Sequence, residues 1–267
     1  MARKILQSGL VLLDSITEAT RADEGQIAVS GSHGGYYAAV LASRGGLRAV
    51  VFNDAGRGLD DAGIAGLRAL DRVGMAGIAV STMSAAIGSA QDAWDNGVVS
   101  YSNATASKLG VCEASVLSAQ FGVLSRADEP AGILGEVEEA RWEVASGQSL
   151  VLCVDSASLI GAEDAGRVIV TGSHGGLIGG DPARACKAQA QLVAFNDAGG
   201  GKDDIGFSRL PALDSRGVAA VALDCHTCRI GDAASSLESG VISRANGLAQ
   251  RLGARKGRSL KSIISEL

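Results

Sequence analysis

The sequence predicts an α/β protein made of two tandem-duplicated three-layer halves, each with a Rossmann-like, mainly parallel sheet. Residues 10–35 match residues 151–176, and both stretches end in the pentapeptide GSHGG. Residues 50–63 match residues 193–206 around the shared letters FNDAG. Short apolar runs alternate with helical patterns in both copies, which is typical of a parallel sheet covered on both faces. We therefore expect two similar halves related by a pseudo-twofold axis.

The copies divide the chain into four predicted parts. Residues 1–110 form the first repeat and residues 149–253 the second. Residues 111–148 are expected to be a helical connector, because the stretch ILGEVEEARWEVA places apolar residues on one side of a helix and glutamates on the other. Residues 254–267 end in apolar residues at helical spacing. We expect this terminal helix to dock on the other half or on a second subunit.

Each element of the first copy follows from its pattern, and the second copy is expected to repeat it. Runs of four to six apolar residues predict strands, and apolar residues three or four apart predict helices. The expected strands cover residues 10–14, 26–31, 48–54 and 76–82. The expected helices cover residues 36–43, 60–74 and 89–110, the last closed by a glycine.

Composition limits the partners that the protein can have. The net charge is −5 and aromatic residues make up 3% of the chain, which argues against a nucleic-acid partner. No apolar run reaches the roughly 18 residues that a membrane-spanning helix needs. Five cysteines without a disulfide-like framework favour a reducing compartment. We expect a cytoplasmic, homo-oligomeric protein with a small-molecule substrate, no membrane partner and no cofactor.

The two GSHGG loops are the first candidate site. Each loop follows a predicted strand, and ligands of open parallel sheets bind beyond the carboxyl ends of the strands. His33 and His174 are expected to act as acid/base groups, or alternatively to hold their loops by hydrogen bonds. The neighbouring serines and glycines are expected to bind substrate, the glycines by letting backbone N–H groups approach an anion: Ser32, Gly34, Gly35, Ser173, Gly175 and Gly176. A plain tight turn is the alternative for these glycines.

Acidic residues end the next strand in each copy. Asp54 follows Asn53, and Asp197 follows Asn196. We expect the aspartates to serve as catalytic groups that orient a histidine or act as a base, and the asparagines to bind substrate. An Asx turn is the alternative interpretation for both aspartates.

The second copy carries polar residues that the first copy lacks. DCHTCRIGD at residues 224–232 stands where the first copy has STMSAAIGS. Asp224 and His226 are therefore expected catalytic residues, and Arg229 is an expected substrate ligand. A C-x-x-C pair in this stretch has zinc-like spacing, but no second pair completes a zinc site, so no metal is expected.

Two classes of function fit these patterns. The favoured one is an enzyme that acts by acid/base chemistry on a small polar or anionic metabolite bound in the cleft between the repeats. Hydrolysis of an amide-like C–N bond is expected in preference to isomerase or lyase chemistry. The alternative is a non-catalytic protein that binds a small anion or metabolite.

Overall fold

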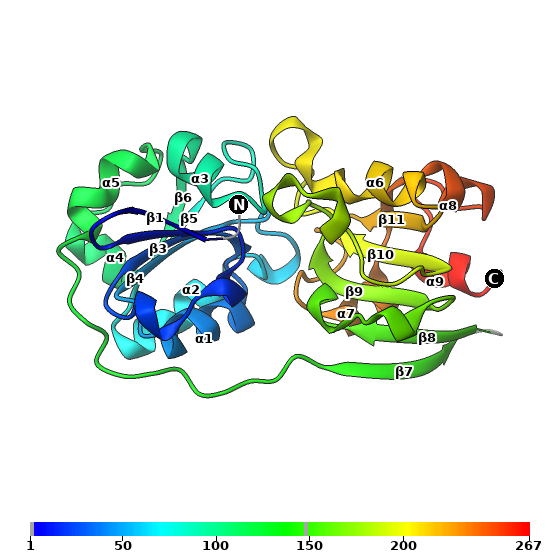
Figure 1. Cartoon of the computed structure of the whole chain (residues 1–267), viewed down its shortest axis with the longest axis horizontal. Coiled ribbons are helices and arrows are strands. Elements are labelled where there is room, and N and C mark those ends of the chain that lie inside the picture. The colour runs from blue at the N-terminus through cyan, green and yellow to red at the C-terminus, as the bar shows by residue number, and fades with distance from the viewer. Residues whose placement is uncertain (1–2, 147–148) are drawn as a thin grey trace.

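The computed structural model describes residues 3–146 and 149–267, and in these ranges the chain forms two mixed sheets of six strands each (Figure 1). The first sheet contains β1 (Arg3–Gln7), β2 (Leu10–Leu13), β3 (Ile27–His33), β4 (Ala49–Asn53), β5 (Ala76–Val80) and β6 (Val99–Ser102). The second contains β7 (Arg141–Ser146), β8 (Ser149–Val154), β9 (Val168–His174), β10 (Leu192–Asn196), β11 (Ala219–Leu223) and β12 (Ile242–Ala245). Strands lie in chain order, with parallel central strands and antiparallel outer ones. The predicted pair of α/β halves is thus confirmed.

Helices cover both faces of each sheet and enclose two cores per half. The first half has α1 (Tyr36–Arg44) and α2 (Ala65–Leu70) on one face, and α3 (Ala90–Asn96), α4 (Ala104–Leu109) and α5 (Leu117–Leu124) on the other. The second half has α6 (Arg209–Ser215) on one face, and α7 (Ala233–Ser239), α8 (Gly247–Arg251) and α9 (Leu260–Ile264) on the other. In the described ranges, none of these helices is long and apolar enough to cross a membrane.

The two halves differ after their GSHGG loops. The first half continues into α1, whereas the second half continues into two short 3-10 turns, Ile178–Gly180 and Pro182–Arg184. Asp181 caps the second turn through a bond from the Ala183 N–H of 2.9 Å, as its position before a proline predicts. Two 3-10 turns therefore stand in the second half at the position in the chain that α1 has in the first half.

The single helix expected over residues 89–110 is wrong. The structure divides this stretch into α3, β6 and α4. Gly97 ends α3 in an extended conformation, and a Cβ there would lie 2.3 Å from the Ala93 carbonyl oxygen. Val99, Tyr101 and Ser102 then pair antiparallel with β5, and valine and tyrosine favour strands.

The helix expected over residues 133–145 is also wrong. Residues 128–140 form an extended segment without helix or strand, and β7 follows as one strand of a hairpin with β8. Trp142 and Val144 pack on the second half, whereas the residues between and beside them are exposed. This alternation has the period of a strand, and pairing along the whole of β8 overrides the helical spacing of the glutamates.

The repeat extends further than the sequence match at both ends. Arg3 on β1 pairs with buried Asp23, and Arg141 on β7 pairs with buried Asp164 in the same way. At the other end α9 corresponds to α5, because Leu117 and Leu260 stand at the same place in their halves. The elements of each half thus run beyond the predicted limits at residues 110 and 149.

The predicted docking of the terminal helix on the other half is not what the structure shows. Leu260, Ile263 and Ile264 of α9 are fully buried in the core between the second sheet and its own helices. The helix therefore completes its own half.

Contacts between the halves obey the pseudo-twofold relation. The Leu59 N–H donates to the Cys225 carbonyl over 2.8 Å, and its repeat counterpart, the Lys202 N–H, donates to the Thr82 carbonyl over 2.8 Å. A small apolar cluster joins two residues of each half: Ala55, Ile87, Ala198 and Ile230. Gly56 and Gly199, another repeat pair, face each other so closely that a Cβ on Gly56 would lie 2.9 Å from the Gly199 Cα. These glycines mark the axis.

The axis gives a first prediction about stability. Gly56→Ala is expected to lower the free energy of unfolding by about 2–4 kcal/mol, because alanine there meets both a left-handed backbone and the opposing glycine. Gly56 has φ +70°. Gly166 has φ +75° with open space around it, so Gly166→Ala should cost only the backbone strain of about 1 kcal/mol. Urea denaturation measures both, and equal losses would contradict the close approach at the axis.

Candidate active site

A cavity of about 770 Å³ lies between the two halves. His33 ends β3 and His174 ends β9, so both GSHGG loops reach it from the carboxyl ends of parallel strands. Its polar lining includes serine, histidine, acidic and basic side chains from both repeats: Ser15, Ser32, His33, Glu138, Glu139, Asp155, Ser156, Ser173, His174, Arg184, Lys187, Arg209, Arg229 and Asp232. The cavity is the place where the duplicated loops meet.

Both loop histidines are held in one orientation by their own loops. The Gly35 N–H donates to Nδ1 of His33 over 3.1 Å, and the Gly176 N–H donates to Nδ1 of His174 over 3.2 Å. Because Nδ1 accepts in each ring, the proton of the neutral imidazole sits on Nε2. A Cβ on Gly35 would lie 2.7 Å from the His33 ring, which explains why glycine stands there.

Both histidines are neutral at neutral pH. Burial lowers the pKa of His33 to about 4. Burial also lowers the pKa of His174 well below its usual value, and the nearby Arg209 cation and His33 lower it further. A neutral imidazole with its proton on Nε2 is a hydrogen-bond donor rather than a base that is ready to change its charge. The histidines are therefore suited to donate an N–H to a ligand oxygen.

The loop serines use only part of their hydrogen-bonding capacity within the loops. The Ser32 hydroxyl accepts from the Ile16 N–H over 3.0 Å, and the Ser173 hydroxyl accepts from the Ala157 N–H over 2.9 Å. In the described ranges neither Oγ–H donates to a protein acceptor. Each serine can thus offer a donor to a molecule in the cavity.

The glycine N–H groups are occupied within the protein, which differs from the predicted anion cradle. The Gly34 N–H donates to the Asn53 carbonyl over 3.1 Å, and the Gly175 N–H donates to the Asn196 carbonyl over 2.8 Å. The N–H groups of Gly35 and Gly176 bind the histidines. These glycines allow tight loop packing, since a Cβ on Gly175 would lie 2.3 Å from the Gly206 carbonyl oxygen. The tight-turn interpretation describes them better.

The two Asn-Asp pairs lie buried behind the cavity. Oδ1 of Asp54 accepts from the N–H groups of Gly56 and Thr82 over 3.0 and 2.9 Å. Asp197 makes the matching bonds to the N–H groups of Gly199 and Cys225 over 2.9 and 3.0 Å. Asn53 and Asn196 likewise accept from backbone N–H groups two residues on, at 2.9 Å each. This is the geometry of Asx turns, and none of the four lines the cavity as described.

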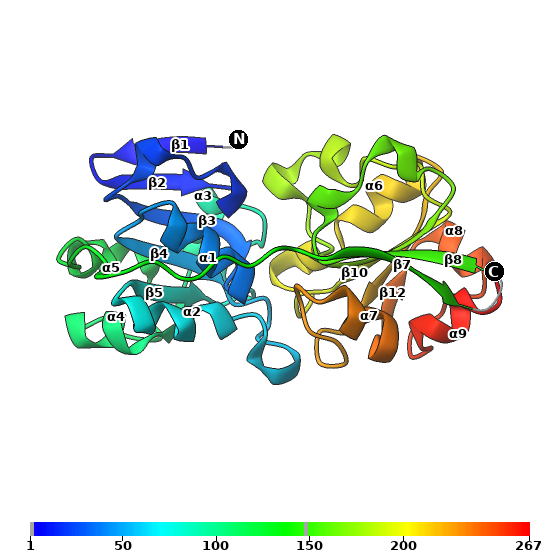
Figure 2. The same cartoon turned by 90° about the horizontal axis from the view of Figure 1, so that it is seen from below.

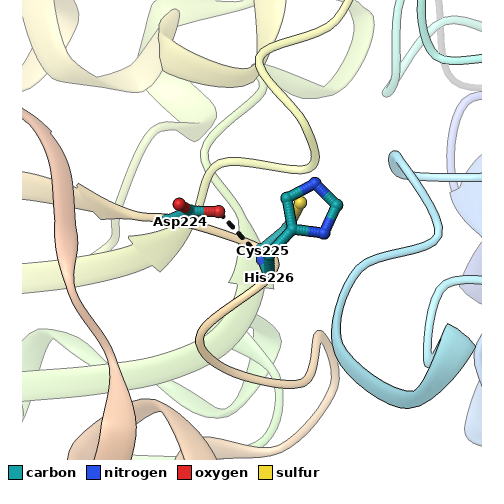
Figure 3. A group of neighbouring side chains, drawn as sticks. All are labelled: Asp224, Cys225 and His226. Atoms are coloured by element: carbon teal, nitrogen blue, oxygen red, sulfur yellow. Dashed lines mark hydrogen bonds between the residues drawn. The ribbon is translucent and has the colours of Figure 1, made fainter.

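His226 and Asp224 lie apart from the two loop histidines. His226 is exposed, and neither residue lines the cavity as described. Oδ1 of Asp224 accepts the His226 backbone N–H over 2.9 Å, while the imidazole points away from that carboxylate (Figure 3). The structure therefore brings together two of the three histidines and places the third elsewhere.

Potential metal-ligand atoms of Asp224, Cys225 and His226 lie within 4.8 Å of one another. Burial, with smaller contributions from Asp197 and Asp224, raises the pKa of the Cys225 thiol to about 12. The thiol is therefore protonated and is a poor ligand unless a metal displaces its proton. Cys228, the other half of the C-x-x-C pair, is not part of this group.

Arg229 lines the cavity, where its charge is already matched. Its guanidinium lies 2.7 Å from the Asp60 carboxylate of the other half and 3.6 Å from that of Asp232. The first of these ion pairs links the halves across the pseudo-twofold axis.

Glu139 is a site residue that the sequence analysis missed. It lies in the extended segment that crosses from one half to the other along the outside of the molecule (Figure 2). Leu134 anchors that segment through its buried side chain and a bond of 2.9 Å from its N–H to the Ser43 hydroxyl on α1. Burial raises the pKa of Glu139 to about 7. The hydrogen bond with Ser156 lowers this pKa in part, and the nearby Asp155 charge raises it. The cavity thus contains a carboxyl group that ionises near neutral pH.

Arg209 on α6 is a second residue that the sequence analysis missed. Its side chain donates to the carbonyl groups of Gly176 and Ala185 over 3.0 and 2.6 Å. Its guanidinium carbon lies 4.9 Å from the centre of the Phe195 ring. The repeat offered a signal, because Gly66 occupies the corresponding position of the first half, where α1 packs closely.

The histidines predict how stability depends on pH. A histidine whose pKa is lowered by folding binds fewer protons in the folded state, so stability is present above the unfolded pKa near 6.5 and is lost as pH falls. We expect His33→Asn, whose amide oxygen can still accept from the Gly35 N–H, to reduce the loss between pH 6.5 and 4 by about 1–2 kcal/mol. Denaturation across that pH range tests this, and an unchanged pH profile would contradict it.

No protein-family model matches the chain, and neither a curated protein nor a solved structure shows significant similarity to it.

Proposed function

We propose that the protein is an enzyme that acts by acid/base chemistry on a small polar or anionic metabolite bound between its halves. The observation that carries this proposal is the lining of one cavity by both loop histidines and by a carboxyl group with a pKa of about 7. Perturbed ionisation in a cavity is characteristic of functional sites. The histidines supply fixed donors, and Glu139 supplies a group that gains and loses a proton under cellular conditions.

The roles proposed for the cavity residues differ from those that the sequence predicts. The sequence predicts that His33 and His174 are the acid/base groups. Two neutral Nε2–H donors are suited to hold a carbonyl oxygen on which negative charge develops. A carboxyl group that titrates near the working pH is suited to general acid/base catalysis. His33 and His174 are therefore assigned to oxyanion stabilisation, and Glu139 to proton transfer.

These roles support hydrolysis of an amide-like C–N bond. Ionised Glu139 takes a proton from water while the water oxygen bonds to the carbonyl carbon, and His33 and His174 donate to the resulting oxyanion. The carbonyl then re-forms, the C–N bond breaks, and Glu139 gives its proton to the leaving nitrogen. Water is the only co-reactant, and Glu139 ends as it began.

The binding protein remains a second candidate, and one observation favours it. Arg209 is a buried cation in a cavity with neutral histidines, and such a group can hold an anion without any reaction. A binding protein should retain its ligand unchanged, whereas the enzyme should release an amine or ammonia.

A screen of small primary and secondary amides, with release of ammonia or amine as the readout, tests the proposed activity. The wild-type chain is compared with His33→Asn/His174→Asn, which keeps loop acceptors and removes both Nε2–H donors. Turnover by the wild type that the double variant lacks would support the enzyme. Equal turnover in both proteins would remove the histidines from the reaction, and ligand binding without turnover would favour the binding protein.

A further inference from the structure

In the described part of the chain, Arg209 is a buried cation that no carboxylate neutralises. Only 3% of the residue is exposed, and its guanidinium contacts two backbone carbonyls and the Phe195 ring. Within residues 3–146 and 149–267, no carboxylate is recorded within ion-pair distance of it. Arg184 and Arg229, which line the same cavity, pair with Glu18 and with Asp60. Arg209 is thus in an unusual position for a charged side chain.

The surroundings of Arg209 make its charge costly. Burial lowers the pKa of Arg209 to about 10, Cys186 raises it, and the weaker effect of the Arg184 cation lowers it. Arg209 in turn lowers the pKa of His174, so its charge acts on that loop histidine. An isolated buried charge is costly unless it is paired. An anion in the cavity would remove this cost.

We infer that Arg209, beside His174, binds a carboxylate group of the substrate. This inference rests on the proposed function and names the substrate class for it, an amide that also carries a carboxylate. A guanidinium offers planar, paired donors that match a carboxylate, and Nη2 has no recorded partner in the described part of the chain. Arg209 is a buried cation, whereas Lys187, Arg184 and Arg229 are exposed on the cavity lining. One buried cation balances one negative charge, which favours a carboxylate over a phosphate dianion.

The position opposite Arg209 supports a dedicated subsite. Gly66 stands at the corresponding place in the first half, and a Cβ there would lie 2.3 Å from the Gly35 carbonyl oxygen. A cation therefore acts on only one of the two loop histidines, although the loops themselves are identical in sequence. The carboxylate is accordingly expected beside His174 rather than beside His33.

Calorimetric titration with small probes tests the carboxylate subsite. Acetate and succinamate are compared with acetamide and inorganic phosphate at constant ionic strength. The wild type should bind the carboxylates more tightly than the neutral amide or phosphate. Arg209→Gln should weaken carboxylate binding by about 10- to 100-fold, since it removes a charge-assisted pair. Arg209→Lys, which keeps the charge but loses the planar fork, should weaken it less.

Arg244→Gln is the matched control. Arg244 also stacks on a phenylalanine, with its guanidinium carbon 3.7 Å from the Phe207 ring centre, but it is more exposed and lies outside the cavity. Carboxylate affinity should be unchanged in this variant. Circular dichroism shows whether each variant folds, and if Arg209→Gln does not fold, the wild-type preference for acetate over acetamide decides the question.

Three results would overturn the inference: no carboxylate binding by the wild type, equal binding of acetate and acetamide, or tighter binding of phosphate. Unchanged affinity in a folded Arg209→Gln protein would overturn it as well. Carboxylate binding without turnover of any carboxylate-bearing amide would leave the subsite in place and reject the proposed enzyme. Turnover of neutral amides that depends on His33 and His174, without carboxylate binding, would reject the subsite alone.

Discussion

His174→Asn is expected to reduce kcat by about 10²–10³-fold, because it removes one preorganised donor to the developing oxyanion. The asparagine oxygen can take over the bond from the Gly176 N–H, so the loop should keep its conformation. The free energy of unfolding at neutral pH should therefore change by less than about 1 kcal/mol. Steady-state kinetics on an amide found in the screen, together with urea denaturation, separates the two effects.

His226→Asn is the same substitution at the exposed histidine outside the cavity. Its kcat should equal that of the wild type. Loss of activity in His226→Asn with full activity in His174→Asn would move the chemistry to the Asp224–His226 stretch, as the sequence alone suggested. Full activity in both variants would exclude His174 and His226 from the reaction.

Glu139→Gln is expected to reduce kcat/KM by about 10²–10⁴-fold, because the amide cannot transfer the proton. The wild-type kcat/KM should rise with pH through about 7, where the Glu139 carboxyl ionises. The residual activity of Glu139→Gln should lack that rise. Glu136→Gln, on the same extended segment but exposed and paired with Arg44, should behave as the wild type does.

Glu139→Gln is expected to lower activity but to raise stability. A loss of activity in this variant therefore cannot come from unfolding. Folding raises the pKa of Glu139, so the folded state binds more protons and loses stability as pH rises from about 4.5 to about 7. Glu139→Gln should remove that loss and stabilise the protein at pH 8 by about 1–2 kcal/mol, allowing for partial solvent screening. A less stable variant would show that the carboxylate is held by an ion pair instead.

The two α/β halves were predicted correctly from the segments in which the two copies of the repeat match each other in sequence. Buried strands such as β4 and β10 are continuous apolar runs, and they were found because both faces of the sheet are covered. The edge strands β1 and β7 were missed, since exposed residues alternate with partly buried ones along them and the bulge between Ile5 and Gln7 of β1 has no counterpart in β7. The short strand β6 was read as helix because it is four residues long and Val99 is its one β-branched residue.

The candidate site was predictable only where the duplication marked it. His33 and His174 stand in identical pentapeptides, and the structure brings them to one cavity. Glu139 carried no such mark, because its role comes from an extended segment that a helical pattern concealed. Arg209 was marked in the sequence only by its exchange for Gly66 in the first copy, and its burial emerged only from the structure.

The pseudo-twofold axis has a consequence for how an unsymmetrical molecule can be held. In a cavity built from two equal halves, such a molecule would have two equivalent orientations, and only one end at a time would meet a given group. The joining of both copies in one chain allowed them to diverge, so that a cation faces one histidine and a glycine takes its place on the other side. An unsymmetrical ligand can then be bound in one orientation only. A symmetric dimer of identical subunits could not favour one of the two orientations.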